Sequence, residues 1–173
     1  QVIERRRAEP GERDDLLGAL MQGLDGPALR DELVTFLLAG HETTANALTW
    51  TLFLLAERPD VQDEAADEAR AALSADGDDS GLPARLPGLR LLLDESMRLY
   101  PPVPRFDREA AAADRLGEHE VGAGDIVSIW PWLLHRHRAL WDDPDAFDPG
   151  RFGEGGPARH RFQYIPFGAG PRT

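Results

Sequence analysis

Residues 27–58, PALRDELVTFLLAGHETTANALTWTLFLLAER, predict one long helix that organises the rest of the chain. Pro27 suits the first turn of a helix, and Arg58 should end it because Arg58 precedes Pro59. At a rise of about 1.5 Å per residue this helix would be roughly 45 Å long. Its apolar residues do not keep to one stripe, so we expect the helix to be buried on nearly every side.

The centre of this helix is polar, although its surroundings are apolar. Residues 40–46 are GHETTAN, and burying such groups without hydrogen-bond partners would cost about 1 to 3 kcal/mol each. Glycine weakens a helix and threonine can bond into its backbone, so we expect a kink or bulge that points Glu42 and Thr43 into a cavity. The alternative is a break between two helices, with Gly40 as the first C-cap. A zinc site of the HExxH type is excluded, because Ala45 stands where the second histidine would be.

Two more helices are predicted at residues 60–73 and 87–99, and the second should stop where Tyr100 precedes a proline. Residues 119–130, HEVGAGDIVSIW, predict a β-hairpin that turns at the Gly-Asp pair. From residue 141 onward proline, glycine and charge dominate without periodicity, which indicates loop. The predicted fold class is therefore mainly α with a small β portion.

A charge network is predicted around residues 94–110, DESMRLYPPVPRFDREA. Glu95 and Arg98 are three residues apart and can pair on one helix face. Their helix is otherwise apolar, so we expect both charges to be half-buried and to need further partners. Arg151, in the segment FDPGRF, is a candidate third member of this network.

The last segment, residues 163–173, is QYIPFGAGPRT. Gly168 and Gly170 permit positive φ angles and a close approach of the backbone to a ligand. A turn-rich tail without function is the alternative that local physics leaves open.

Composition limits the class of protein. The chain has 173 residues, of which 42% are hydrophobic and 29% charged, as in a folded, water-soluble protein. The net charge of −12 argues against binding to nucleic acid. The sequence contains no cysteine, so these residues supply neither a disulfide nor a thiolate metal ligand.

Together and in this order, the segments resemble the cytochrome P450 family of haem-thiolate monooxygenases. AGHETT (39–44) is similar to the oxygen-activation motif of the family, and ESMR (95–98) to its Glu-x-x-Arg motif. FDPGRF (147–152) is similar to the Pro-x-Arg-Phe meander, and FGAGPRT (167–173) to all but the last residue of Phe-x-x-Gly-x-Arg-x-Cys. The resemblance implies a partial P450 domain over 1–173 that lacks the N-terminal half, the ligand cysteine and the final helix.

The resemblance also implies haem b as the cofactor and assigns roles to individual residues. Glu42 and Thr43 would be the acid and alcohol that deliver protons to dioxygen. Glu95, Arg98 and Arg151 would form a structural network that holds the ligand loop. The residues expected at the haem are Ala39, Gly40, Arg108, Phe167, Gly168, Gly170 and Arg172, and those expected at the substrate pocket are Val103 and Pro104.

The thiolate ligand of the family would follow Thr173, so we expect the parent protein to be the monooxygenase and this chain alone to be inactive. The resemblance implies a hydrophobic small-molecule substrate, dioxygen, and electrons from NAD(P)H through a ferredoxin or flavoprotein. A soluble, cytoplasmic, bacterial protein is expected, and a membrane anchor on the parent is left open. A basic patch for the electron donor could be formed by Arg136, Arg138, Arg159 and Arg161.

The residues also leave two other classes of function open. A truncated helical domain that acts by interaction would explain the missing cysteine, but not the costly polar pair in an apolar helix. A metal-dependent hydrolase could use His135 and His137, which would share a face on a strand, but no third ligand has a suitable spacing. We expect His135 instead to pack or hydrogen-bond near the edge of the haem.

Overall fold

A computed structural model describes residues 2–8, 11, 14–75, 79–156 and 159–170. The contacts divide the chain into two compact units, residues 1–44 and 45–173. Helix α3 (Gly26–Glu57) begins in the first unit and ends in the second. The described residues form helices and two small antiparallel ladders, which confirms the predicted fold class.

The first unit contains α1 (Val2–Ala8), α2 (Leu16–Gly23) and the first turns of α3. The carboxylate of Asp15 accepts the N–H of Gly18 at 2.8 Å and so caps the start of α2. The same carboxylate accepts two N–H groups of Arg6, at 2.9 and 2.7 Å, which ties α1 to α2.

Helix α3 confirms the long helix, with bounds one residue from those predicted. It is α-helical through Gly40 without interruption, so the expected bulge and the alternative of two helices are wrong, while a kink stays a prediction. The threonines fit into the regular helix because their hydroxyls donate to the carbonyl four residues earlier, from Thr43 to Ala39 at 2.6 Å and from Thr49 to Ala45 at 2.7 Å.

The expected burial of α3 on nearly every side is also wrong for this chain. Leu37 is 68% exposed and Leu52 64% exposed. The buried residues of α3 are Leu29 near its start, and Thr51 and Leu54 near its end. An apolar pattern shows which faces favour burial, whereas burial itself requires another element to cover them.

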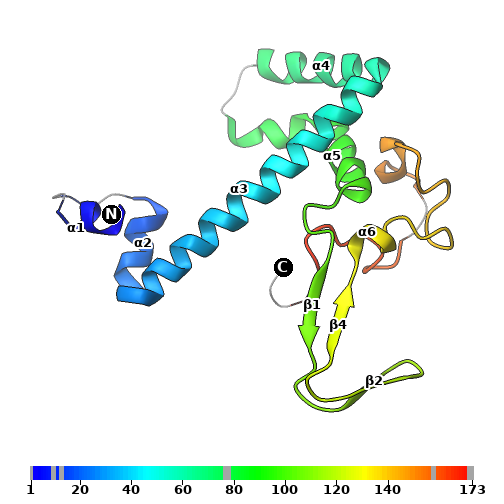
Figure 1. Ribbon diagram of the computed structural model, residues 1–173. Helices are drawn as coiled ribbons and strands as arrows, with labels where there is room; N and C mark the ends of the chain where they lie inside the picture. Colours follow the sequence, from blue (N-terminus) through cyan, green and yellow to red (C-terminus); the bar gives the residue numbers. More distant parts are fainter. Residues whose placement is uncertain (1, 9–10, 12–13, 76–78, 157–158, 171–173) are drawn as a thin grey trace. The chain divides into compact units, whose positions relative to one another are not determined.

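In the second unit, α4 (Pro59–Ser74) and α5 (Pro87–Leu99) confirm the two predicted helices. A 3-10 turn, η1 (Asp79–Arg85), precedes α5. A second one, η2 (Pro149–Phe152), packs on α5. Figure 1 shows α4 above α5 and the orange η2 segment beside α5, so α5 is the central element of this unit.

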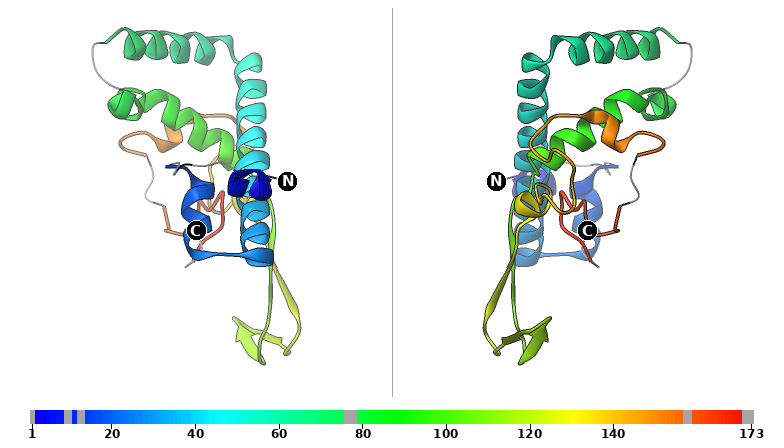
Figure 2. Two further views of the ribbon diagram at one scale, coloured as in Figure 1. Left: turned by 90° about the vertical axis from the view of Figure 1, so that its left-hand side faces the viewer. Right: turned by 90° about the vertical axis from the view of Figure 1, so that its right-hand side faces the viewer.

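The strand pairing differs from the predicted hairpin. β1 (Phe106–Glu109) pairs with β4 (Ile126–Ile129), and β2 (Asp114–Leu116) pairs with β3 (His119–Val121). The two predicted runs therefore belong to different ladders, and the hairpin β2–β3 lies at the end of the β1–β4 ribbon (Figure 2). The Gly-Asp pair does not turn the chain back on β3: the N–H of Gly124 donates to Ala110 at 2.8 Å and the N–H of Ala110 to Asp125 at 2.9 Å, which extends the β1–β4 ladder.

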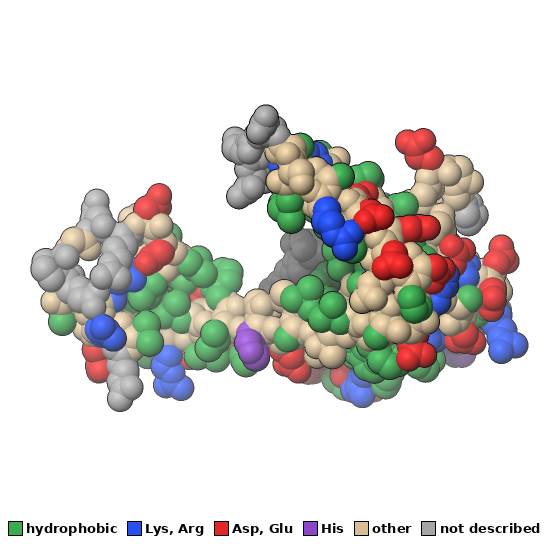
Figure 3. Space-filling model, turned by 90° about the horizontal axis from the view of Figure 1, so that it is seen from above, with side chains coloured by type: hydrophobic (Ala, Val, Ile, Leu, Met, Phe, Trp, Pro, Cys, Tyr) green, Lys and Arg blue, Asp and Glu red, His purple; other side chains and the backbone are tan. Residues whose placement is uncertain are grey.

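The surface of α4 is acidic. Seen from above in Figure 3, carboxylates gather over this helix, and its exposed acidic residues are Asp60, Asp63, Glu64 and Asp67. Within the described ranges, no helix is both long and apolar enough to cross a lipid bilayer.

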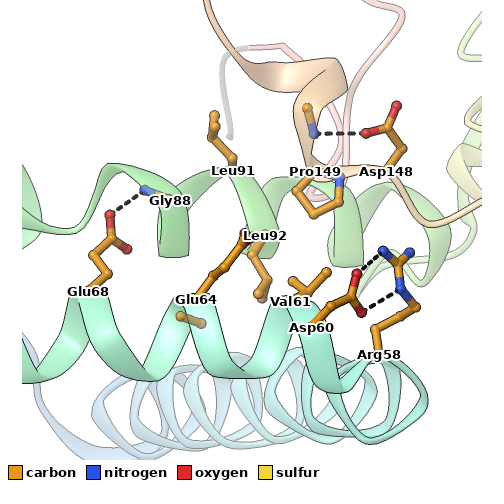
Figure 4. A pocket seen from close by; sticks show the side chains of 12 residues that line it. Arg58, Asp60, Val61, Glu64, Glu68, Gly88, Leu91, Leu92, Asp148 and Pro149 are labelled. Carbon is orange, nitrogen blue, oxygen red and sulfur yellow. Dashed lines mark hydrogen bonds and ion pairs between the residues drawn. The ribbon is translucent and has the colours of Figure 1, made fainter.

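A groove of about 520 Å³ lies between α4, α5 and η2. At one end Arg58 and Asp60 form an ion pair, with N···O distances of 3.0 and 2.7 Å. At the other end the carboxylate of Glu68 accepts the N–H groups of Gly88 and Leu89, both at 2.7 Å (Figure 4). Because α5 has no capping side chain of its own, this carboxylate from α4 satisfies the free amides at its start.

Candidate functional site: a buried charge network and the loop beside it

Glu95 and Arg98 on α5 are both fully buried, with 0% exposure, which is deeper than the sequence predicts. Nε and one terminal nitrogen of Arg98 donate to the two carboxylate oxygens of Glu95, at 2.6 and 2.8 Å. The planar guanidinium matches the carboxylate at two points, which fixes the orientation of both side chains. Their spacing of three residues on one helix face brings them together.

The remaining N–H groups of Arg98 donate to backbone carbonyl oxygens. One terminal nitrogen reaches His135 at 2.8 Å and Pro144 at 2.7 Å, and the other reaches Ala146 at 3.0 Å. All five donors of the guanidinium are therefore satisfied, as a buried charge requires. Sequence reasoning missed these three acceptors because backbone carbonyls leave no mark in the side-chain pattern.

Arg151 joins the pair from η2. Its Nε donates to Glu95 at 3.3 Å, and its terminal nitrogens donate to the carbonyl oxygens of Asp142 and of Asp143, the latter at 2.7 Å. The N–H of Asp148 also donates to Glu95, at 3.0 Å. The structure thus brings together the three residues that the sequence singled out and links them to residues 142–148.

Aromatic rings cover the network. The guanidinium of Arg98 lies 5.1 Å from the ring centroid of Trp141, which is buried. The hydroxyl of Tyr164 hydrogen-bonds to the carbonyl oxygen of Asp94 at 3.0 Å and to its carboxylate at 3.1 Å. Burial, and then the neighbouring charge of Asp94, raises the pKa of Tyr164 well above its ordinary value, so this phenol stays protonated as a donor.

His135 is fully buried beside Arg98. Its Nε2 accepts the N–H of Ile165 at 2.8 Å, and its Nδ1 lies 3.2 Å from the carbonyl oxygen of Arg98. Burial lowers the pKa of His135 to about 4; the hydrogen bond to the backbone of Arg98 opposes this shift, and the charges of Arg98 and Arg136 add to it. The hydrolase alternative finds no support, because His137 is exposed and bonds locally to the N–H of Ala139.

Residues 165–170, which begin with the partner of this histidine, form a turn-rich loop. The N–H of Gly168 donates to the carbonyl oxygen of Ile165 at 3.0 Å, and φ is +89° at Gly168 and +118° at Gly170. These angles lie in the region that favours glycine. Phe167 is half exposed, at 51%, so the loop presents an aromatic side chain on its open side.

The segment before β1 contacts this loop. The N–H of Val103 donates to the carbonyl oxygen of Pro166 at 3.3 Å, while Pro104 is exposed and its carbonyl accepts from Trp132. A Cβ on Gly168 would lie 3.4 Å from the ring of Phe106, so the loop passes close to β1.

Arg108 on β1 is exposed and lies over the ring of Phe106, 5.0 Å from its centroid. In the part of the chain that the structure describes, Arg108 has no carboxylate partner, and its only hydrogen bond is to the carbonyl of Asp107. An exposed guanidinium near an aromatic loop fits a flat ligand that carries carboxylates.

The other predicted haem residues are placed as follows. The predicted haem residues Ala39 and Gly40 are exposed on α3; of the predicted catalytic residues Glu42 is exposed and Thr43 partly buried, and all four lie within the unit 1–44. The remaining site residues belong to the unit 45–173, and Arg172 lies outside the described residues.

A family model described as cytochrome P450 matches residues 2–173. The chain belongs to the cytochrome P450 family. Among curated relatives, the putative cytochrome P450 132 of Mycobacterium tuberculosis is 39% identical over 178 residues, covering 99% of this chain and 38% of that protein. The cytokinin hydroxylase of Arabidopsis thaliana is 38% identical over 198 residues, covering 100% and 37% respectively.

Solved P450 structures share the fold. Cyanobacterial CYP120A1 with bound retinoic acid has a TM-score of 0.88 at 30% identity, covering 98% of this chain and 41% of that one. The haem domain of cytochrome P450DA has a TM-score of 0.84 at 33% identity, covering 98% and 40%. The chain thus spans about two fifths of the P450 proteins that it matches.

Proposed function

We propose that this chain forms the C-terminal part of the catalytic core of a haem-thiolate monooxygenase, which hydroxylates an organic substrate with dioxygen. The observation that carries the proposal is the buried network of Glu95, Arg98 and Arg151. It joins α5 and η2 to residues 135–146 and leaves no donor of Arg98 unsatisfied. Such a network suits a rigid support for the neighbouring loop 165–170.

Haem is the cofactor that the family uses, and the residues present fit its edge. Among the described residues Arg108 has no carboxylate partner and could pair with a propionate, and Phe167, Gly168 and Gly170 form an open loop with an exposed aromatic ring. By resemblance, Ala39, Gly40 and Arg172 would add contacts. The sequence holds no cysteine, so the thiolate would come from the position after Thr173 in the family motif. When bound, the haem supplies the activation of dioxygen.

Glu42 and Thr43 are the proposed proton-delivering residues. The hydroxyl proton of Thr43 is donated to the carbonyl of Ala39, at 2.6 Å. Its oxygen lone pairs therefore remain available to accept from a water molecule, which Thr43 would hold in place. Glu42, one residue earlier and exposed, would pass protons from solvent to that water.

Electrons would come from NAD(P)H through a ferredoxin or flavoprotein, and the substrate would be a hydrophobic small molecule. Arg138 and Arg161 are exposed and Arg136 and Arg159 are partly buried. The exposed pair would offer the donor its basic contacts, because an acidic partner is attracted by charges that remain in solvent.

The experiment uses the intact protein with the family cysteine in place. A thiolate-type carbon monoxide difference spectrum is expected, together with product formation that depends on an electron donor. Thr43→Ala and Glu42→Gln should each lower the product formed per NAD(P)H by about tenfold or more, because the first removes the side chain that holds the water and the second the acid that passes protons to it. Thr49→Ala is the control, since Thr49 makes the same backbone bond six residues further along α3.

Two results would contradict the proposal. One is an intact protein that binds no haem, which would favour the alternative of a non-catalytic helical interaction domain. The other is a coupling ratio that stays unchanged in both Thr43→Ala and Glu42→Gln.

A further inference from the structure

The buried ring of His135 lies between two parts of the chain that are far apart in sequence. One is the last turn of α5, through the carbonyl oxygen of Arg98 at 3.2 Å from Nδ1. The other is the first residue of the loop 165–170, through the N–H of Ile165 at 2.8 Å from Nε2. The ring is therefore a direct link between the charge network and the loop.

The two partners determine the protonation of the ring. A backbone N–H can only donate, so Nε2 must carry a lone pair to accept from Ile165. A backbone carbonyl can only accept, so Nδ1 must carry the proton toward Arg98. One N–H and one lone pair make the neutral Nδ1–H tautomer, which is the form that satisfies both neighbours.

The surroundings favour the same neutral form. The charged groups near the ring are the cations Arg98, on α5, and Arg136, after α6 (Pro131–Leu134), and both oppose a second positive charge. The rings of Tyr164 and Trp141 cover it at centroid distances of 5.4 and 6.4 Å. Tyr164 is itself held protonated, so it brings no negative charge to the imidazole.

His135 and Arg98 are linked twice. The side chain of Arg98 donates to the carbonyl of His135 at 2.8 Å, and the ring of His135 faces the carbonyl of Arg98. A chain of hydrogen bonds therefore runs from Arg98 through His135 to Ile165, and from there to Gly168, whose N–H donates to Ile165.

We infer that His135 is a positioning residue, which as the neutral Nδ1–H tautomer holds the start of the loop 165–170 against the Glu95–Arg98–Arg151 network. It acts on the backbone of the loop and touches no reacting atom. An effect of His135 on haem binding rests on the proposed function, whereas its hydrogen bonds to Arg98 and Ile165 do not.

Nitrogen NMR on the intact protein with labelled histidine tests the bonding directly. The expected spectrum shows Nδ1 of His135 protonated, Nε2 unprotonated, and no titration between about pH 5 and pH 8. Protonation of Nε2, or a titration near the ordinary pKa of histidine, would overturn the inference without any mutation.

Two amide variants separate the two bonds. Glutamine reaches the position of Nε2, so His135→Gln can still accept from Ile165, whereas asparagine reaches only the position of Nδ1, so His135→Asn can bond only to Arg98. Hydrogen exchange at the Ile165 amide should be about tenfold to a hundredfold faster in His135→Asn and close to the parent value in His135→Gln. Exposed His137 provides the control, and His137→Asn should leave this exchange rate unchanged.

The same variants, loaded with haem, show whether the loop matters to the cofactor. His135→Asn should lose a larger fraction of the thiolate-type carbon monoxide spectrum than His135→Gln. Equal exchange rates at Ile165 in both variants would contradict the positioning role. If the intact protein bound no haem, the proposed function would fail, but the NMR and exchange results would still decide the role of His135.

Discussion

Thr51 on α3 and Ser96 on α5 are hydrogen-bonded through their side-chain hydroxyls, whose oxygens lie 2.9 Å apart in a buried contact. Thr51 also donates to the carbonyl of Ala47 at 2.7 Å. One hydroxyl holds a single proton, so the two bonds form together when Thr51 donates to Ala47 and accepts from Ser96. This pair connects the end of α3 to the helix that holds the charge network.

Thr51→Val should therefore destabilise the protein. The change leaves the buried hydroxyl of Ser96 without its partner, which costs about 1 to 3 kcal/mol in the free energy of unfolding. Urea unfolding of the intact protein measures it. Adding Ser96→Ala to Thr51→Val should recover part of the loss, because no polar group is then left unpaired, and Thr49→Val, at an exposed threonine, should cost little. A double variant that is less stable than Thr51→Val would contradict this account.

Glu95→Gln should have a larger effect. It removes the negative charge from a site where two arginines and a backbone N–H converge, and leaves the buried Arg98 uncompensated, at a cost of about 3 to 5 kcal/mol. Arg90→Gln is the matched control, because its pair with Asp94 is 4.0 Å long and the arginine is 82% exposed. Arg90→Gln should change the free energy of unfolding by no more than about 0.5 kcal/mol in the same experiment. If Glu95→Gln lowered the free energy of unfolding no more than Arg90→Gln does, the network would contribute little to stability.

The free energy of unfolding should decrease toward acid pH because of His135. Burial holds its pKa at about 4, below the ordinary value of 6.5 that the unfolded chain has. As the pH falls from about 6.5 to about 4, the unfolded state binds the proton first, so the free energy of unfolding decreases, and the effect levels off below that range. The total size is about 3 kcal/mol.

His135→Gln should remove this component, since glutamine does not titrate. The unfolding free energy of the parent minus that of His135→Gln should therefore fall by about 3 kcal/mol as the pH falls from about 6.5 to about 4. Curves that run parallel would mean that His135 is not buried as a neutral ring.

The cap that α4 provides for α5 is a further test. Glu68→Ala removes the acceptor of two amides, those of Gly88 and Leu89, and should lower the free energy of unfolding by about 1 to 2 kcal/mol. Glu64→Ala, at an exposed carboxylate on the same helix, should change it by no more than about 0.5 kcal/mol. Gly88→Ala should also lower the free energy of unfolding, by less than Glu68→Ala. A Cβ at position 88 would lie 3.1 Å from the carboxylate oxygens of Glu68 and would crowd them. If neither Glu68→Ala nor Gly88→Ala lowered the free energy of unfolding, the capping role of Glu68 would be contradicted.

The sequence alone determined helices α3, α4 and α5 and the family. Prolines at 27, 59, 87 and 101 restrict the backbone around them, so the ends of α3, α4 and α5 could be predicted to within one residue. Four short motifs in a fixed order indicated the P450 family. The pairing of Glu95 with Arg98 followed from their spacing on one helix, which is a local property.

Only the tertiary structure decided which distant groups complete the hydrogen bonds of these residues and which strands pair. The carbonyls that complete Arg98 come from residues 37 to 48 positions away, and the bond from Ile165 to His135 spans 30 residues. Strand pairing was likewise decided by a distant partner, since β4 pairs with β1 and not with its neighbour β3. Spacing and local conformation act over a few residues and are visible in the sequence, whereas burial, hydrogen-bond partners and the protonation of His135 depend on which distant segments fold against one another.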